Sequence, residues 1–419
     1  MAKLLLINHY AGSRLHGMEY RPYYLAREFV RLGHHTTITA ASVSHVRAVS
    51  PTMKSAVKEE EIDGIRYVWL KTLAYKGNGV RRVINMLTFV ARLLIHRSQL
   101  VGAFRPDVVI ASSTYPLDIV PAAVISREHG ARLVFEVHDL WPLSVIEVGG
   151  LSKWHPFVIL LQLAEDFAYR RADRVVSLLP GAKTYMLEHG MAAHKFEHIP
   201  NGIDVAEWET NEVCVPREHE ARIEKLRREG RFCVAYVGAH GFVNALDTIL
   251  NAAQLMREEG VGFVLVGQGT ERDALQAKAR ELGLTDVWFL PSIPKASVPG
   301  LLRSMDALFI GLRRSAIFRF GISPNKLMDY MMAGKPILQA IEAGNDMVAE
   351  SGCGVTIPPE NPEALVEAIR SLMSMTPSER EAMGRRGREY VMAHHDYRLL
   401  ARRFLDVLEG DREQSTHLQ

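Results

Sequence analysis

The chain has 419 residues, of which 47% are hydrophobic and 23% are charged. This length exceeds what one hydrophobic core usually fills, so we expect a soluble globular protein with at least two domains. The formal net charge of +2 argues against general nucleic-acid binding. Three widely spaced cysteines, Cys214, Cys233 and Cys353, lack metal-ligand spacing and fit a reducing cytoplasm.

The first half of the chain alternates short apolar runs with helical patterns. Residues 19–32 place Leu25, Phe29 and Leu32 on one side of a predicted helix. Strands that alternate with helices indicate parallel β-α-β units. Runs with the character of strands lie at residues 3–8, 36–41, 64–70, 107–111, 132–137, 174–179 and 195–199.

The same alternation restarts in the second half. We therefore predict an α/β protein with two Rossmann-like domains, whose parallel sheets face a cleft. In such open sheets, ligands bind outside the carboxyl ends of the strands. The second set of strands is predicted at 232–237, 262–266, 287–290, 307–311, 336–340 and 354–357, and its helices at 245–257, 271–282, 297–304, 325–333, 363–374 and 378–393.

The most informative stretch of the chain is residues 321–336. Lys326 and Asp329 lie three residues apart at the start of a predicted helix, with Ser323 and Asn325 close before them. A helix start and a lysine together suit phosphate oxygens. A carboxylate can accept hydrogen bonds from ribose hydroxyls. This segment therefore predicts a binding site for a nucleoside diphosphate.

A long loop follows the first predicted strand. Residues 8–22 contain Gly12 and Gly17, which permit close approach of the backbone to a ligand. The loop lacks the Gly-x-Gly-x-x-Gly spacing of a dinucleotide site, and the chain has no Walker-type Gly-Lys-Ser/Thr. A plain strand–helix connection is the alternative, but the loop exceeds the usual length of two to six residues.

Polar residues follow another predicted strand at His138 and Asp139. This histidine could donate a hydrogen bond to a sugar hydroxyl, and the aspartate could orient it. A lone histidine in a turn is the alternative interpretation. Further along, Gly267 and Gly269 form a turn that enters a helix. Such a turn can hold a base or a phosphate, or can simply reverse the chain.

Residues 80–100 form an unusually apolar helical pattern. Its polar residues fall on one narrow stripe, and most other positions are aliphatic or aromatic. A helix of this kind is buried in a core or lies against lipid. Both interpretations stay open. The polar stripe comprises Arg81, Asn85, Thr88, Arg92, His96 and Gln99, with Arg82 and Arg97 at its margins.

These motifs, taken in order, resemble the retaining GT-B glycosyltransferases of family 4, which use nucleotide sugars. The resemblance covers nearly the whole chain. The version of the 321–331 motif found here, with Gly-Met-Glu-Tyr-Arg-Pro at 17–22, is similar to bacterial fucosamine-type transferases of O-antigen and capsule assembly. The matching segments are 17–19, 33–34, 200–204 (Pro-Asn-Gly-Ile-Asp), 266–269, 329–336 and 354–365.

The resemblance implies a GT-B fold and roles for its parts. Residues 1–205 would form an acceptor-side domain, residues 206–394 a nucleotide-sugar-binding domain, and residues 395–419 a C-terminal helix that packs back on the first domain. Lys326 would neutralise the leaving diphosphate, and Asp329 would hold the ribose. Gly17 would let the first loop approach the phosphates, and His138 would lie at the donor sugar.

A second cation is usual in the family, and Arg314 or its neighbour Arg313 is the candidate. The usual arginine position after the first strand of the second domain is occupied by a Gly-Ala-His-Gly segment, whose Gly238 and Gly241 are candidate nucleotide contacts. The family often has two glutamates eight positions apart, and the earlier one falls on Gly321. The missing carboxylate predicts a deoxy or N-acetylamino donor sugar.

The resemblance implies a UDP-sugar donor, a glycan or polyprenyl-diphosphate-linked acceptor and no metal or other cofactor. We expect a cytoplasmic protein, with peripheral contact to the inner membrane through residues 80–100 if that helix lies against lipid and not in the core. Three alternatives stay open: a sugar-nucleotide 2-epimerase, a catalytically silent nucleotide-binding assembly partner, and a dinucleotide oxidoreductase. The last is disfavoured by the missing glycine fingerprint.

Overall fold

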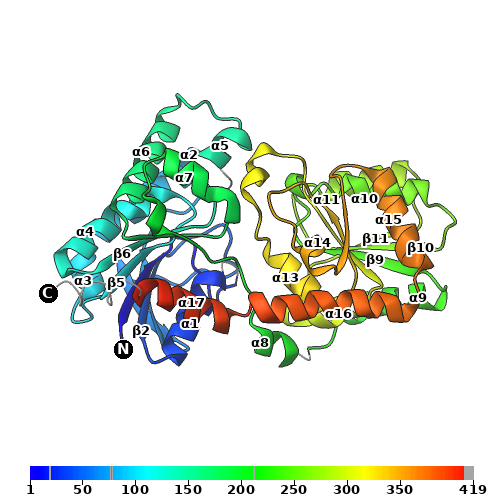
Figure 1. Cartoon of the computed structure of the whole chain (residues 1–419), viewed down its shortest axis with the longest axis horizontal. Coiled ribbons are helices and arrows are strands. Elements are labelled where there is room, and N and C mark those ends of the chain that lie inside the picture. Colours follow the sequence, from blue (N-terminus) through cyan, green and yellow to red (C-terminus); the bar gives the residue numbers. More distant parts are fainter. Residues whose placement is uncertain (18–19, 76, 78, 211–212, 410–419) are drawn as a thin grey trace. The chain divides into compact units, whose positions relative to one another are not determined.

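The computed structural model describes residues 1–409 apart from 18–19, 76, 78 and 211–212. The chain divides into two compact units (Figure 1). The first comprises Met1–Asn201 together with the segment from Tyr397 onward, and the second comprises Gly202–Asp396. No helix among the described residues combines the length and the apolar character needed to cross a membrane.

The sheet of the first unit has the strand order β3-β4-β2-β1-β5-β6-β7-β8. All neighbouring strands run parallel except the β3–β4 pair. The strands are β1 (Lys3–Ile7), β2 (His35–Ala41), β3 (Val57–Ile62), β4 (Ile65–Leu70), β5 (Val108–Ala111), β6 (Arg132–Val137), β7 (Arg174–Ser177) and β8 (Phe196–His198).

The helices of the first unit include one from the far end of the chain. This helix, α17 (Tyr397–Glu409), packs on α1 (Tyr20–Arg31). Tyr24 stacks on Tyr397 with ring centroids 5.0 Å apart, and Phe29 meets Phe404 at 5.7 Å. The remaining helices are α2 (Val80–Ile95), α3 (Arg97–Val101), α4 (Ile119–His129), α5 (Leu143–Glu147), α6 (Pro156–Arg171) and α7 (Lys183–Glu188).

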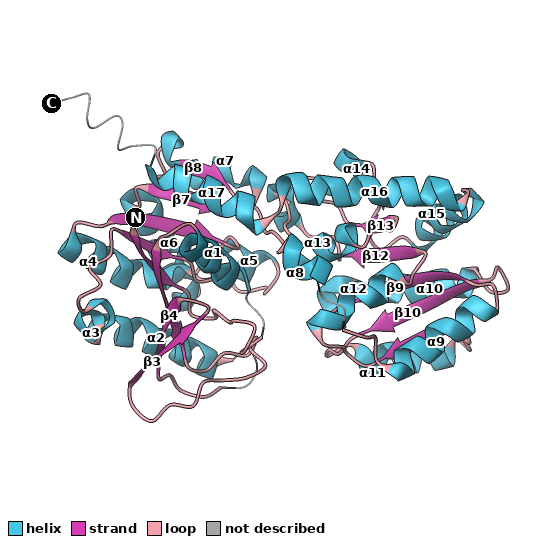
Figure 2. Cartoon of the chain, turned by 90° about the horizontal axis from the view of Figure 1, so that it is seen from below, coloured by secondary structure: helices cyan, strands magenta, loops and turns pink. Residues whose placement is uncertain are grey.

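The sheet of the second unit is parallel throughout, in the order β11-β10-β9-β12-β13-β14. Its middle strand shows why helices flank both faces (Figure 2). Cys233 and Ala235 of β9 join one buried core, while Val234 and Tyr236 join the other. The strands are β9 (Phe232–Val237), β10 (Val261–Val266), β11 (Val287–Leu290), β12 (Ala307–Gly311), β13 (Ile337–Ala340) and β14 (Gly354–Ile357).

The helices of the second unit divide between these two cores. Helices α10, α11 and α15 contribute to the core that holds Tyr236, and helices α8, α9, α12, α13, α14 and α16 contribute to the other. The helices are α8 (Val205–Thr210), α9 (Arg217–Arg228), α10 (Asp247–Leu255), α11 (Arg272–Glu281), α12 (Val298–Arg303), α13 (Asn325–Met332), α14 (Met347–Ser351), α15 (Pro362–Ser374) and α16 (Pro377–His394).

The pattern of buried side chains on helix α2 differs from the predicted separation of a polar stripe from apolar positions. Asn85 of that stripe is fully buried, and its Nδ2 donates to the Leu73 carbonyl oxygen at 2.5 Å. Phe89 and Leu93 are buried beside it, whereas Val80 and Ile95 are 75% and 71% exposed. One side of α2 therefore belongs to the core of the first unit, and apolar side chains remain on its outer side.

Candidate active site

Helix α13 positions the strongest candidate residue, Lys326. The helix follows Pro324, no side chain caps its start, and its first turn holds no acidic residue. Leu327, Met328 and Tyr330 are buried and fix the helix against the core. The uncapped first turn exposes backbone N–H groups, and the helix dipole favours an anion at this end.

The ammonium group of Lys326 contacts two neutral acceptors. Nζ donates to the Tyr236 hydroxyl at 2.7 Å and to Asn244 Oδ1 at 2.9 Å. Among the described residues, no carboxylate lies within ion-pair distance of this nitrogen. Burial without a counter-ion lowers the pKa of Lys326 to about 7. A half-buried cation that lacks an anionic partner is suited to bind one.

The predicted glycines lie in two neighbouring loops, after β9 and after β10. A Cβ atom at Gly267 would lie 1.9 Å from the Gly238 carbonyl oxygen, and one at Gly269 would lie 2.3 Å from the His240 carbonyl oxygen. At Gly238, where φ is +155°, a Cβ atom would lie 3.3 Å from Lys326 Nζ. These three glycines therefore allow the loops and the lysine to pack closely, which a side chain would prevent.

A Cβ atom at Gly241 would lie 3.7 Å from Asn244 Nδ2, an ordinary contact, and the role of this glycine in nucleotide binding stays a prediction. The residue before it, His240, was not among the site residues predicted from the sequence. Its side chain is fully buried, and neither ring nitrogen has a hydrogen-bond partner in the described chain. Burial, with Arg272 and Lys326 nearby, lowers the pKa of His240 to about 4. The imidazole beside the candidate site is therefore neutral at pH 7.

Asp329 has different neighbours from Lys326. Burial raises the pKa of its carboxyl group, while Lys295 and the Trp208 indole N–H favour the charged form. Nε1 of this indole nevertheless has no hydrogen-bond partner of standard geometry in the described chain. Ser323 is half-buried and Asn325 is exposed at the helix start. Contacts of these three residues with a nucleotide stay predictions.

The two candidate arginines already face carboxylates. Arg314 Nη2 lies 3.0 Å from Glu342 Oε2, and its side chain is 65% exposed. Arg313 contacts Glu360 at 2.6 Å and Asp247 at 3.2 Å. Both guanidinium charges are therefore compensated locally, and the assignment of a second cation to Arg314 stays a prediction.

In the first unit, His138 follows β6 and belongs to a buried polar network. Its Nε2 lies 3.0 Å from Ser112 Oγ and 3.1 Å from Glu136 Oε2. Glu136 is fully buried and accepts from Arg21 Nη2 at 2.9 Å. The charge of Arg21 and the hydrogen bonds to Glu136 outweigh burial and lower the pKa of this carboxyl group to about 2.

The carboxylate that contacts His138 is therefore Glu136, and not Asp139 as the sequence predicts. Asp139 Oδ1 accepts from the Leu140 backbone N–H at 2.9 Å, and Ser144 and Trp141 also favour its charged form. Burial raises the pKa of Asp139. These three partners lie in the turn into α5 and its first residues, so Asp139 holds that turn rather than the histidine.

The first loop folds back on itself around its glycines. The Gly17 N–H donates to the Ser13 carbonyl oxygen at 2.8 Å, and Gly17 adopts φ +75°. A Cβ atom there would lie 3.1 Å from Ala48 Cβ. The Gly12 carbonyl oxygen accepts from the Tyr67 hydroxyl at 2.8 Å. The motif residues Met18 and Glu19 lie outside the described residues.

Two family models match successive parts of the chain. The "Glycosyl transferase 4-like domain" matches residues 16–202, and "Glycosyl transferases group 1" matches residues 218–390. The solved HepE protein of Anabaena with UDP-glucose aligns over 98% of this chain and 100% of its own, with a TM-score of 0.68 and 15% identity.

The chain is a glycosyltransferase of the GT-B fold. Curated relatives agree with this assignment. The chain is 27% identical over 278 residues to a probable glycosyltransferase, WbjE of Pseudomonas aeruginosa, which covers 65% of this chain and 68% of the relative. It is 24% identical over 298 residues to the putative colanic acid biosynthesis glycosyl transferase WcaI of Escherichia coli, covering 68% and 70%.

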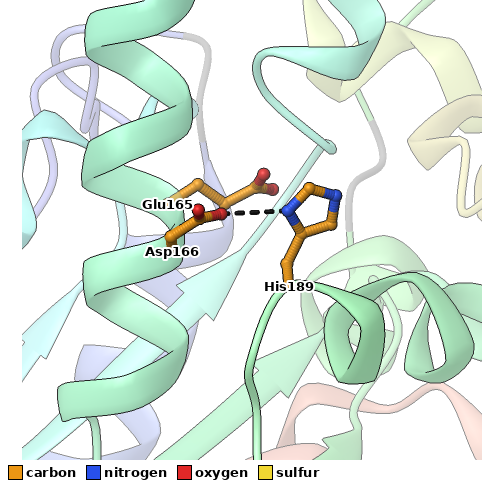
Figure 3. A group of neighbouring side chains, drawn as sticks. All are labelled: Glu165, Asp166 and His189. Atoms are coloured by element: carbon orange, nitrogen blue, oxygen red, sulfur yellow. Dashed lines mark hydrogen bonds and ion pairs between the residues drawn. The ribbon is translucent and has the colours of Figure 1, made fainter.

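The glycosyltransferase has a second group of titratable side chains between α6 and the end of α7 (Figure 3). His189 Nδ1 lies 2.9 Å from Asp166 Oδ1, and Gln162 Nε2 donates to both neighbouring carboxylates. Glu165 also accepts from the hydroxyls of Tyr169 and Tyr185, each at 2.8 Å. Burial raises the pKa of Glu165 to about 8. The carboxylate oxygens thus already have protein donors.

Proposed function

We propose that this glycosyltransferase moves a sugar from UDP to a glycan or polyprenyl-diphosphate-linked acceptor during surface polysaccharide synthesis. The single observation that supports a nucleoside diphosphate as the leaving group is the ammonium of Lys326, which has no carboxylate partner among the described residues and lies beside the uncapped start of α13. The name of WcaI supports the polysaccharide pathway, and the UDP-glucose complex of HepE supports the nucleotide.

The chemistry proposed for the site is metal-independent transfer with retention at the anomeric carbon. Negative charge grows on the diphosphate as the bond to the sugar breaks. Lys326 and the first N–H groups of α13 stabilise that charge, which is electrostatic catalysis. The leaving phosphate takes the proton of the acceptor hydroxyl. His138 is proposed to contact the donor sugar. Its Nε2 lies beside Glu136 and Ser112, which fix the orientation of the ring.

The donor sugar is proposed to lack the usual ring hydroxyl pattern, because the position of one family carboxylate is Gly321. The backbone there has φ +97°, a conformation that a glutamate adopts only with strain. Gly321 N–H donates to the Phe318 carbonyl oxygen at 2.9 Å, and Ile322 N–H donates to Asn345 Oδ1 at 2.7 Å. The turn is therefore built around a residue without a side chain, which supports a deoxy or N-acetylamino sugar.

A donor panel tests this proposal. We expect turnover with UDP-N-acetyl-fucosamine or another UDP-linked deoxy or N-acetylamino sugar, and little with UDP-glucose. Product analysis by NMR reports whether the anomeric configuration is retained. Fast use of UDP-glucose with none of UDP-N-acetyl-fucosamine would reject the donor assignment. UDP release with an epimerised sugar and no acceptor would indicate an epimerase, and UDP binding without any turnover would indicate a silent assembly partner.

The outer side of α2 is proposed to contact the inner membrane from the cytoplasmic face. Ile84 and Leu87 are each 43% exposed, in the same helix as the exposed Val80 and Ile95. Arg81 on this helix is also exposed and suits anionic lipid headgroups.

Liposome flotation tests the membrane contact. The double variant Ile84→Asp/Leu87→Asp is expected to float less than the wild type with vesicles of phosphatidylethanolamine and phosphatidylglycerol, because buried apolar area drives interfacial binding. Leu255→Asp, on an exposed position of α10 in the other unit, is the control. Equal flotation of the wild type and the double variant would rule out membrane contact through the outer side of α2.

A further inference from the structure

Two neutral side chains, Tyr236 and Asn244, hold the ammonium of Lys326. Tyr236 belongs to β9 and is fully buried, while Asn244 lies in the short turn after it. The two contacts to Nζ measure 2.7 and 2.9 Å. Nζ also lies 4.4 Å from the centroid of the Tyr236 ring, a distance at which the aromatic face attracts a cation.

One backbone carbonyl orients both of these acceptors. The Ala239 carbonyl oxygen accepts from the Tyr236 hydroxyl at 2.7 Å and from Asn244 Nδ2 at 3.0 Å. The tyrosine proton therefore points at Ala239, which leaves an oxygen lone pair for Lys326. The amide of Asn244 is fixed in the same way, with Nδ2 toward Ala239 and Oδ1 toward the lysine.

Arg313 holds the same turn from its other end. Its backbone N–H donates to the Val243 carbonyl oxygen at 2.8 Å, and its Nε donates to the Phe242 carbonyl oxygen at 3.0 Å. Its guanidinium is in turn fixed by Asp247 and Glu360. Arg313, a candidate for the second cation, thus supports the loop that carries Asn244.

An ammonium group can donate three hydrogen bonds, and this arrangement uses only some of them. Lys326 Nζ carries three protons, and the two neutral acceptors engage two of them. The third remains available to a ligand. A carboxylate in place of Asn244 would hold the lysine equally well, but it would cancel the charge that an anion has to meet.

We propose that Asn244, with Tyr236, is a positioning residue for sugar transfer: it holds Lys326 in place without neutralising it, so that one N–H and the full charge face the diphosphate. This inference rests on the proposed function, because it assumes that Lys326 meets the diphosphate of the nucleotide. It adds a role for a residue that carries no charge and acts through the lysine rather than through the nucleotide.

The test compares Asn244→Asp with the wild type by calorimetric titration of UDP between pH 6 and 9. The introduced carboxylate forms an ion pair with Lys326, so we expect UDP affinity at pH 7 to fall about 10- to 100-fold. Gln254→Glu makes the same charge change on an exposed position of α10 and is expected to bind UDP like the wild type.

The pH profile separates positioning from a general structural role. In the wild type, UDP affinity is expected to fall as pH rises above about 7, since free Lys326 loses its proton there. The other titratable groups that face it, Tyr236 and His240, stay neutral in this range. The carboxylate of Asn244→Asp raises the pKa of Lys326, so the fall is expected about one pH unit higher or more.

Tyr236→Phe is a second variant, which removes the other neutral acceptor without adding charge. It is expected to lower turnover about tenfold without the upward shift in the pH midpoint of UDP binding that Asn244→Asp causes, because the loss of an acceptor disfavours the charged lysine. Wild-type affinity and an unshifted pH profile in Asn244→Asp would overturn the positioning role while leaving the proposed function standing. Failure of the wild type to bind UDP at any pH would overturn the proposed function, and this inference with it.

Discussion

Lys326→Ala is expected to lower the kcat of sugar transfer about 100- to 1,000-fold, the usual loss when one charge-stabilising contact to a transition state is removed. The physical reason is that no carboxylate among the described residues compensates this ammonium, so its charge is available to the leaving diphosphate. Steady-state kinetics with the donor found in the panel measure the effect. Circular dichroism checks that the variant keeps the secondary structure of the wild type.

Lys225→Ala is the control for this loss of charge. Lys225 lies on an exposed turn of α9, 3.8 Å from Glu229, and its removal is expected to leave kcat unchanged. UDP binding is measured for both variants, so that lost affinity is separated from lost turnover. A rate for Lys326→Ala close to that of the wild type would discard the assignment of this residue to the diphosphate.

The second large effect concerns stability. Arg21→Met is expected to lower the free energy of unfolding of the first unit by about 3–5 kcal/mol, because it leaves the buried Glu136 carboxylate without its cation. Arg21 Nη2 also donates to the Ile199 carbonyl oxygen at 3.0 Å, and Nη1 donates to that of Pro200. Urea unfolding followed by far-ultraviolet circular dichroism measures the change.

An exposed ion pair in the same unit supplies the control. Arg97 lies 2.8 Å from Glu128, and both side chains are about two-fifths exposed, at 39% and 40%. Arg97→Met is expected to change stability by less than about 1 kcal/mol. Similar losses for the two methionine variants would contradict the importance assigned to the buried pair.

The same pair predicts a pH dependence. The folded-state pKa of Glu136 is lowered to about 2 from an ordinary value of 4.5, chiefly by Arg21 against the opposing effect of burial. Its contribution to stability is therefore complete above about pH 4.5 and is lost as pH falls toward 2. In Arg21→Met this acid-side loss is expected to shrink. An unchanged acid transition would show that other groups govern it.

The parallel strands were predictable because helices bury both of their faces, which makes them read as short apolar runs. Strand β3 escaped prediction because it is the edge strand and carries Lys58, Glu59 and Glu61. A signal for it was present. Asp63 and Gly64 have φ of +54° and +77°, the two-residue turn that joins β3 to β4. An Asp-Gly pair between two runs is a strong hairpin signal.

The candidate site was partly predictable. Lys326 follows from its place at a helix start, whereas Tyr236 and Asn244 are 90 and 82 residues away in the chain and are brought to it only by the fold. The partner of His138 was predictable in principle. Residues two apart on a strand share a face, so Glu136 and not Asp139 lies beside the histidine. A glutamate inside an apolar strand was the overlooked signal.

The return of the chain to its first unit has a consequence for synthesis on the ribosome. Tyr397, Leu400 and Phe404 of α17 belong to the same buried core as β1 and α1. Domains usually fold in the order in which they are made. Here the first unit is synthesised first but cannot complete its core until nearly two hundred later residues have been translated. Part of its apolar interior stays uncovered until then. Nascent chains halted before Tyr397 would therefore depend most on chaperones.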